Sequence, residues 1–194
     1  MPTGSVWISV HVTEVLVFAI GNPSRGDDAL GPLLCSRLEA ELGGNRRGGD
    51  GRASVRFVED FQLQIEHVLD MEGADMVLFV DAGRNTKAPF EFCPVWPVDR
   101  ASALSHALEP DKLLALYPKT LGHPPPPAFL LCVAGVSFDL GAPLSGPAQE
   151  HLEQACAFIR LRLLDPEVER WLQAARPAAS GAFSDKPGRE SWSG

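Results

Sequence analysis

The chain of 194 residues has the length of one domain, and its 45% hydrophobic and 22% charged residues supply enough apolar material for one core. Its formal net charge of −8 at pH 7 disfavours nucleic acid as a partner, because an acidic protein is repelled by phosphates. The sequence has no run of roughly 18 apolar residues, the length that crosses a membrane, and no signal-peptide pattern at its N-terminus. We therefore expect a cytoplasmic protein with neither a nucleic acid nor a membrane as partner.

The cysteines are widely separated in the sequence, and no two of them form a C-x-x-C pair. This spacing predicts neither a zinc clamp nor a thioredoxin-type redox pair. We expect all four to be reduced and most of them to be buried as small hydrophobic residues. They are Cys35, Cys93, Cys132 and Cys156.

The first half of the chain alternates buried strands with helices. Residues 14–20 (EVLVFAI) and 76–80 (MVLFV) are continuous apolar runs, typical of strands buried on both faces in a parallel sheet. A shorter strand is predicted at 55–59. Apolar residues at helical spacing predict one helix from Asp28 onward and another across 62–71, so strands and crossover helices repeat as right-handed βαβ units.

The second half continues this pattern with one irregular strand. Residues 90–98 alternate in polarity but contain two prolines, which limits them to an edge strand. A short helix is predicted at 111–116 and a buried strand at 129–133. A long helix follows with Ser145 as its N-cap, and a shorter helix is predicted at 167–175.

These elements predict a single α/β domain over residues 14–176, a three-layer α/β/α sandwich around a mostly parallel central sheet. Segment 1–13 is irregular, and segment 177–194 is rich in Pro, Ala, Ser, Gly and charged residues. We expect both of these segments to be flexible termini.

Acidic residues and a histidine stand where strands of this sheet end, and ligands bind beyond the carboxyl ends of strands in such folds. The turn after the first strand ends in Asp27 and Asp28, the third strand is followed by Asp81, and His106 follows the edge segment. Together they make a partial coordination sphere for a divalent first-row metal, with positions left open for water or substrate. Taken singly, the aspartates also suit capping roles, above all an N-cap for Asp27 or Asp28, and His106 suits the surface.

A nucleotide site is the main alternative for the turn after the first strand. Its glycines, Gly21, Gly26 and Gly31, lack the G-x-G-x-x-G spacing of a dinucleotide fold, and the G-K-[ST] ending of a P-loop is missing. Asp27 and Asp28 stand at the helix N-terminus where a phosphate would bind, and their charge would repel it. A Rossmann-like nucleotide-binding protein is therefore disfavoured.

The same turn resembles the hydrogenase maturation endopeptidase family, the HybD-like α/β/α proteins. Residues 21–31 (GNPSRGDDALG) fit the family pattern G-N-x-x-x-x-D-[DE]-x-x-G throughout. A strand ending in D-A appears at Asp81-Ala82, a Ser-His pair before a helix at Ser105-His106, and an L-S-P-like element at 144–147 (LSGP). The resemblance extends from about residue 15 to residue 163, nearly the whole part predicted to be ordered.

This resemblance implies an endopeptidase that removes the C-terminal extension of a nickel-loaded [NiFe] hydrogenase large-subunit precursor. It also implies that Asp28, Asp81 and His106 contact the nickel of the precursor and act in cleavage. The enzyme would group with aspartic-type peptidases and hold no tightly bound cofactor of its own. Asp28 stands where the family often has Glu, which is one methylene longer. His67 and His123 are the substitutes if His106 is not the third contact.

The segment 60–67 (DFQLQIEH) replaces the D-G-G-T-x-G turn common in relatives and resembles the subgroup that serves NAD-coupled or bidirectional [NiFe] hydrogenases. In this interpretation Gln62, Gln64 and His67 shape specificity for one large subunit, with Asp60 near the site. A non-catalytic alternative keeps the same fold and acidic loop: a metal-sensing chaperone or binding module for the hydrogenase subunit. Such a module would survive replacement of Asp28 or Asp81, whereas an enzyme would lose processing.

Overall fold

The computed structural model describes residues 12–42, 53–98 and 108–175, and these residues form one five-stranded sheet in the order β2-β1-β3-β5-β4. Neighbouring strands β2, β1, β3 and β5 run parallel, and only β4 is antiparallel, against β5 at the edge. The mostly parallel sheet and the irregular edge strand predicted from the sequence are therefore confirmed. The strands are β1 (Thr13–Ile20), β2 (Ala53–Asp60), β3 (Met76–Gly83), β4 (Phe90–Val95) and β5 (Ala128–Ala134).

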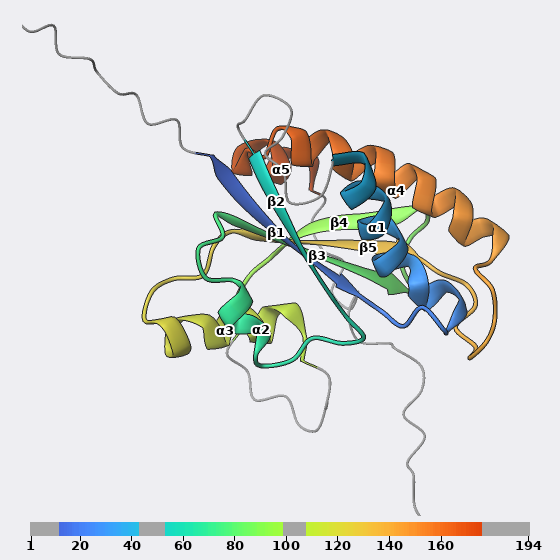
Figure 1. Ribbon diagram of the computed structural model, residues 1–194, viewed down its shortest axis with the longest axis horizontal. Coiled ribbons are helices and arrows are strands. Elements are labelled where there is room, and N and C mark those ends of the chain that lie inside the picture. The colour runs from blue at the N-terminus through green and yellow to red at the C-terminus, as the bar shows by residue number, and fades with distance from the viewer. Residues whose placement is uncertain (1–11, 43–52, 99–107, 176–194) are drawn as a thin grey trace, which may run out of the picture.

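Helices cover both faces of the sheet, with α1, α4 and α5 on one side and α2 and α3 on the other (Figure 1). Two separate hydrophobic clusters fill the spaces between these layers. The three-layer α/β/α sandwich is thus confirmed. The helical segments are the 3₁₀ turn η1 (Gly26–Ala29) and the helices α1 (Leu30–Leu42), α2 (His67–Asp70), α3 (Pro110–Leu121), α4 (Gly146–Leu164) and α5 (Val168–Ala174).

Strand β1 shows why the apolar runs are continuous. Val15, Val17 and Ala19 pack toward α1 and α4, whereas Leu16 and Phe18 pack toward α2 and α3. All five are at most 1% exposed. Because a strand places successive side chains on opposite faces, a strand covered on both faces needs apolar residues at every position.

Strand β3 is longer than the sequence predicts, and the difference concerns Asp81. The prediction ends the strand at Val80, but β3 continues to Gly83 because β5 supplies partners as far as Ala134. On its other side the pairing with β1 ends at Val80, where the chain of β1 leaves the sheet. Asp81 therefore lies within β3, at the point where one of its two neighbouring strands has ended.

Two helices differ from their predicted lengths. The predicted helix 62–71 is reduced to α2, because the segment around it forms turns in which the N–H groups of His67 and Val68 donate to the carbonyls of Gln64 and Ile65, three residues back. The predicted helix 111–116 extends through Pro118 to Leu121, since the buried Tyr117 packs the second half of α3 against the sheet. The N-cap role of Ser145 is confirmed, because its hydroxyl accepts from the N–H of Ala148.

The four cysteines are free and buried, as the sequence predicts. None of the helices in the described ranges is long and apolar enough to cross a membrane. The predicted flexible segments 1–13 and 177–194 lie almost wholly outside the described residues, although Thr13 already belongs to β1. The expected extent of the domain, 14–176, stays a prediction.

Gly31 in the first turn of α1 allows the helix to contact the carboxyl ends of the two central strands. A Cβ at this position would collide with the carbonyl oxygen of Ile20 and would lie 2.9 Å from that of Val80. We expect Gly31→Ala to lower the free energy of unfolding by about 1–3 kcal/mol, because backbone atoms must move to admit the methyl group. Urea unfolding measures this loss. The control is Gly146→Ala in α4, where nothing lies within 4 Å, and an equal effect of both substitutions would contradict the close approach.

Candidate functional site

The turn between β1 and α1 places η1, which carries Asp28, against β3. Gly21 begins the turn at φ 145°, a conformation in which a side chain would collide with the carbonyl oxygen of Asp28. The carboxylate of Asp28 is half-buried, and its Oδ2 accepts from the backbone N–H of Asn22 at 3.1 Å. The η1 turn that carries Asp28 contacts β3, the strand that carries Asp81. The two acidic residues predicted for the site thus lie on elements that touch.

Asp81 is a nearly buried carboxylate, with 4% of its surface exposed. Its position in β3 places it on the same face as Val77 and Phe79, toward α2 and α3. Oδ1 accepts from the N–H of Ala82 at 2.8 Å. Across the sheet Asp81 pairs with Cys132, and burial together with the charge of Asp81 raises the pKa of that thiol to about 12. Cys132 is therefore a protonated core residue and not a nucleophile.

Asp27 has a role that sequence reasoning missed. It is fully buried, and its carboxylate accepts four hydrogen bonds of 2.6–2.9 Å, from the N–H groups of Val136, Ser137 and Ser145 and from the hydroxyl of Ser145. Burial alone would raise the pKa of the Asp27 carboxyl, but these donors outweigh burial and hold the pKa below its ordinary value. The N-cap alternative is wrong, because Arg25 occupies the N-cap position of η1 and makes no side-chain cap bond.

Backbone hydrogen bonds join the same two loops along their length. The N–H of Asp27 donates to the carbonyl of Ser137 (2.7 Å), and that of Gly141 donates to Ser24 (2.7 Å). The N–H of Gly26 donates to the carbonyl of Ala142 (3.2 Å). The loop after β5 thus holds η1 in place, and with it the backbone of Asp28.

The third predicted residue, His106, lies outside the described residues, and so does Ser105. Of the two substitutes, His67 is engaged elsewhere, since Nδ1 accepts from Gln64 and Nε2 lies 3.4 Å from Oδ2 of Asp60. His123 is exposed and packs against Tyr117. The segment after His123 enters β5 at Ala128, which pairs with Val77 at the amino end of the sheet, whereas Asp81 lies toward the carboxyl end.

Within residues 12–42, 53–98 and 108–175, no three His, Cys, Asp or Glu side chains are grouped so that they could hold a metal ion. The described residues include two of the three predicted site residues, Asp28 and Asp81, on elements that contact each other. A pair of this kind can contribute two ligands to a metal that is brought by another molecule, or it can provide a general base.

Comparisons with solved structures find this arrangement of elements in hydrogenase maturation enzymes. The [NiFe] hydrogenase maturation protease HycI from Thermococcus kodakarensis KOD1 matches with a TM-score of 0.58 and 25% identity, over 78% of this chain and 92% of that one. An endopeptidase from Escherichia coli matches at 0.55 and 21%, over 77% and 93%. The maturating endopeptidase HybD from E. coli matches at 0.53 and 20%, over 76% and 90%.

The chain has the fold of the [NiFe] hydrogenase maturation proteases. The resemblance to the HybD-like proteins predicted from the sequence is thereby confirmed at the level of fold. No family model matches the chain, and no curated protein matches it by sequence. At this low identity, the similarity of the folded structure carries the assignment of the fold.

The Asp27 network gives a prediction about stability. Asp27→Asn replaces an acceptor-only carboxylate with an amide that cannot satisfy all four donors, so we expect a loss of about 2–3 kcal/mol of unfolding free energy at pH 7. Because the folded-state pKa of Asp27 is lowered, the stability that its charge contributes is present at neutral pH and is lost as the pH falls through the acidic range. The difference between the two proteins should therefore shrink between pH 7 and pH 3.

Urea unfolding at several pH values measures this difference. Asp28→Asn is the matched control, because Asp28 is only half-buried and its carboxylate accepts from the N–H of Asn22, whereas that of Asp27 accepts from four donors. A stability difference for Asp27→Asn that is the same at pH 7 and pH 3 would show that its charge is not what holds the two loops.

Proposed function

We propose that this protein is an endopeptidase that removes the C-terminal extension of a nickel-loaded [NiFe] hydrogenase large-subunit precursor. The observation that carries the proposal is the shared fold with maturation proteases, combined with two acidic residues, Asp28 and Asp81, on contacting elements at the carboxyl edge of the sheet. Both acidic residues occupy the positions at which the sequence fits the family motifs. In open α/β sheets this edge is where ligands bind.

Nickel belongs to the substrate in this proposal. Asp28, Asp81 and His106 contact the nickel ion that the precursor already carries, and the protease holds no metal of its own between reactions. Carboxylate and imidazole groups are suitable ligands for such an ion. Only a loaded precursor then presents an ion that docks the tail, so the metal serves as a checkpoint before an irreversible cleavage.

Two chemical routes are compatible with a pair of carboxylates. In the first, the bound metal polarises the scissile carbonyl or lowers the pKa of the attacking water. In the second, one carboxylate acts as a general base that takes a proton from the attacking water, as in aspartic-type peptidases. In both routes water adds to the carbonyl carbon, the peptide C–N bond breaks, and the leaving amine takes up a proton.

The segment 60–67 is where we place specificity for one large subunit. Gln62, Gln64 and His67 stand here in place of the glycine-rich turn of relatives, which suggests a precursor of the NAD-coupled or bidirectional hydrogenases. Phe61 and Ile65 add apolar surface, with 64% and 58% of each residue exposed. A cytoplasmic location fits this partner.

The metal checkpoint predicts a difference between two forms of the same precursor. Purified protein is mixed with nickel-loaded and with nickel-free large-subunit precursor, and the mass of the intact precursor is followed over time. We expect a short C-terminal peptide to be lost from the loaded form only. Equal cleavage of both forms would contradict the role of nickel as a checkpoint but would still support the peptidase activity.

The role of Asp81 is tested by a substitution that preserves shape. Asp81→Asn removes the charge but keeps the volume, so we expect processing to be abolished with the fold retained, as measured by the same mass assay and by circular dichroism. Glu150→Gln on the exposed surface of α4 is the control and should process normally. If the Asp81 variant still binds and cleaves the loaded precursor, this carboxylate is not catalytic. If the wild-type protein binds the precursor but removes no peptide, the chaperone or binding-module alternative takes its place.

A further inference from the structure

A buried histidine that the proposed chemistry does not use lies beside an acidic residue at the same edge of the sheet. The ring of His67 packs against Phe18 with 5.2 Å between centroids, and its Nε2 lies 3.4 Å from Oδ2 of Asp60. Only 9% of the His67 side chain is exposed, compared with 29% of the Asp60 side chain. The imidazole is therefore enclosed, whereas the carboxylate reaches solvent.

The hydrogen bonds of His67 determine which ring nitrogen carries the proton. Nδ1 accepts from the backbone N–H of Gln64 at 3.0 Å, so in the neutral ring the proton is on Nε2, the atom that faces Asp60. The side-chain amide of Gln64 donates to the same oxygen of Asp60 at 3.1 Å. The other oxygen accepts from the N–H of Phe61 at 2.6 Å. Asp60 thus accepts two hydrogen bonds from its own loop, and the Nε2 of His67 lies 3.4 Å from one of its oxygens.

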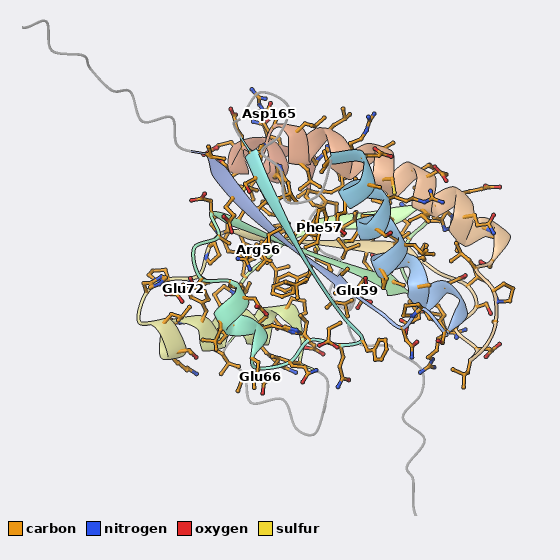
Figure 2. All side chains as sticks on the ribbon, in the orientation of Figure 1. Arg56, Phe57, Glu59, Glu66, Glu72 and Asp165 are labelled. Carbon is orange, nitrogen blue, oxygen red and sulfur yellow. The ribbon has the colours of Figure 1, made fainter. Side chains whose placement is uncertain are left out.

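The helix that carries His67 is itself fixed to β2. The guanidinium of Arg56 donates to the carbonyl of Asp70, the last residue of α2, at 2.7 Å, and Arg56 lies on β2 beside Phe57 (Figure 2). The helix α2 is therefore bonded to β2 at its last residue, and the imidazole at its first residue is bonded to the turn before it.

Asp60 is joined to the acidic turn through its backbone. It is the last residue of β2, and its carbonyl accepts from the N–H of Gly21 at 3.1 Å, where the turn toward Asp28 begins. A carboxylate at this position lies on the same edge of the sheet as Asp28 and Asp81. Its exposed part can accept a hydrogen bond from a donor on a bound peptide.

We propose that His67 is a positioning residue that, through its protonated Nε2, holds the Asp60 carboxylate in place to bind a hydrogen-bond donor of the precursor peptide. This inference rests on the proposed function, because the peptide is the substrate of that reaction. Asp60 makes the contact with substrate, and His67 acts only through Asp60. The arrangement contributes to peptide binding and not to the cleavage step.

The test uses the processing assay with nickel-loaded precursor and separates KM from kcat. Asp60→Asn and His67→Leu should each raise KM about tenfold, the effect of losing one charged hydrogen bond, with kcat changed little. His67→Gln keeps an N–H donor near the position of Nε2 and should restore KM to near the wild-type value. His67→Leu keeps the apolar packing against Phe18, which makes it the matched variant without a donor.

A double-mutant cycle distinguishes positioning from simple packing. If His67 acts through Asp60, His67→Leu should have little further effect on KM when Asp60 is already Asn. Independent effects that multiply would overturn the proposal, as would an unchanged KM in the His67→Leu protein. Wild-type protein that cleaves no precursor would instead be a failure of the proposed function.

A measurement without substrate keeps the inference testable if the leucine variant does not fold. Nitrogen-15 NMR of the imidazole in the wild-type protein should show the proton of the neutral ring on Nε2, with chemical shifts that change in Asp60→Asn. A proton on Nδ1, or nitrogen shifts that are unaffected by the Asp60 substitution, would contradict the proposed contact.

Discussion

The structure of the site depends on one buried negative charge. Asp27 is placed where water cannot solvate it, and it is tolerated there because four donors from the loop between β5 and α4 surround it. These donors come from residues more than a hundred positions away in the sequence. Satisfying this charge therefore joins the turn after β1 to the loop after β5 and fixes the backbone next to Asp28. Ser145 has two roles, because its hydroxyl caps α4 and also donates to the carboxylate of Asp27.

The neighbouring residues Asp27 and Asp28 thus lie in different environments and have different roles. Asp27 has all its acceptor capacity turned inward, whereas Asp28 is half-buried and accepts from Asn22 in its own turn. The sequence motif alone does not distinguish the roles of its two adjacent aspartates. In the folded chain one acid is structural and the other is the candidate for contact with substrate.

Much of the fold was predictable because its signals are local. Strands covered on both faces need unbroken apolar runs, and those of β1, β3 and β5 were identified within two residues at most ends. The extension of β3 through Asp81 was missed because it depends on the length of β5, a partner distant in the sequence. The helix predicted at 62–71 was wrong over most of its length, because its apolar periodicity does not distinguish a helix from the successive turns that surround α2.

The candidate site was predictable in part. Asp28 and Asp81 were identified from the rule that ligands bind at the carboxyl edge and from the motif, and the structure places their elements in contact. The role of Asp27 was not predictable, because a sequence pattern does not show which distant N–H groups will surround a carboxylate. The L-S-G-P element before α4 was noticed as a motif, yet nothing in it indicated that its serine would bind the acidic turn. The roles of Asp28, Asp81 and His106 stay predictions, and His106 lies outside the described residues.

The antiparallel direction of β4 has a consequence for how the chain can change over time. Because β4 returns along β5, the connection from β3 to β4 stays at the carboxyl edge, together with those that follow β1, β2 and β5. The proline-rich connector from α3 into β5 lies at the opposite edge, where the carbonyl of Pro127 accepts from Val77 at the start of β3. Insertions or deletions in that connector are therefore insulated from the acidic residues by the full height of the sheet.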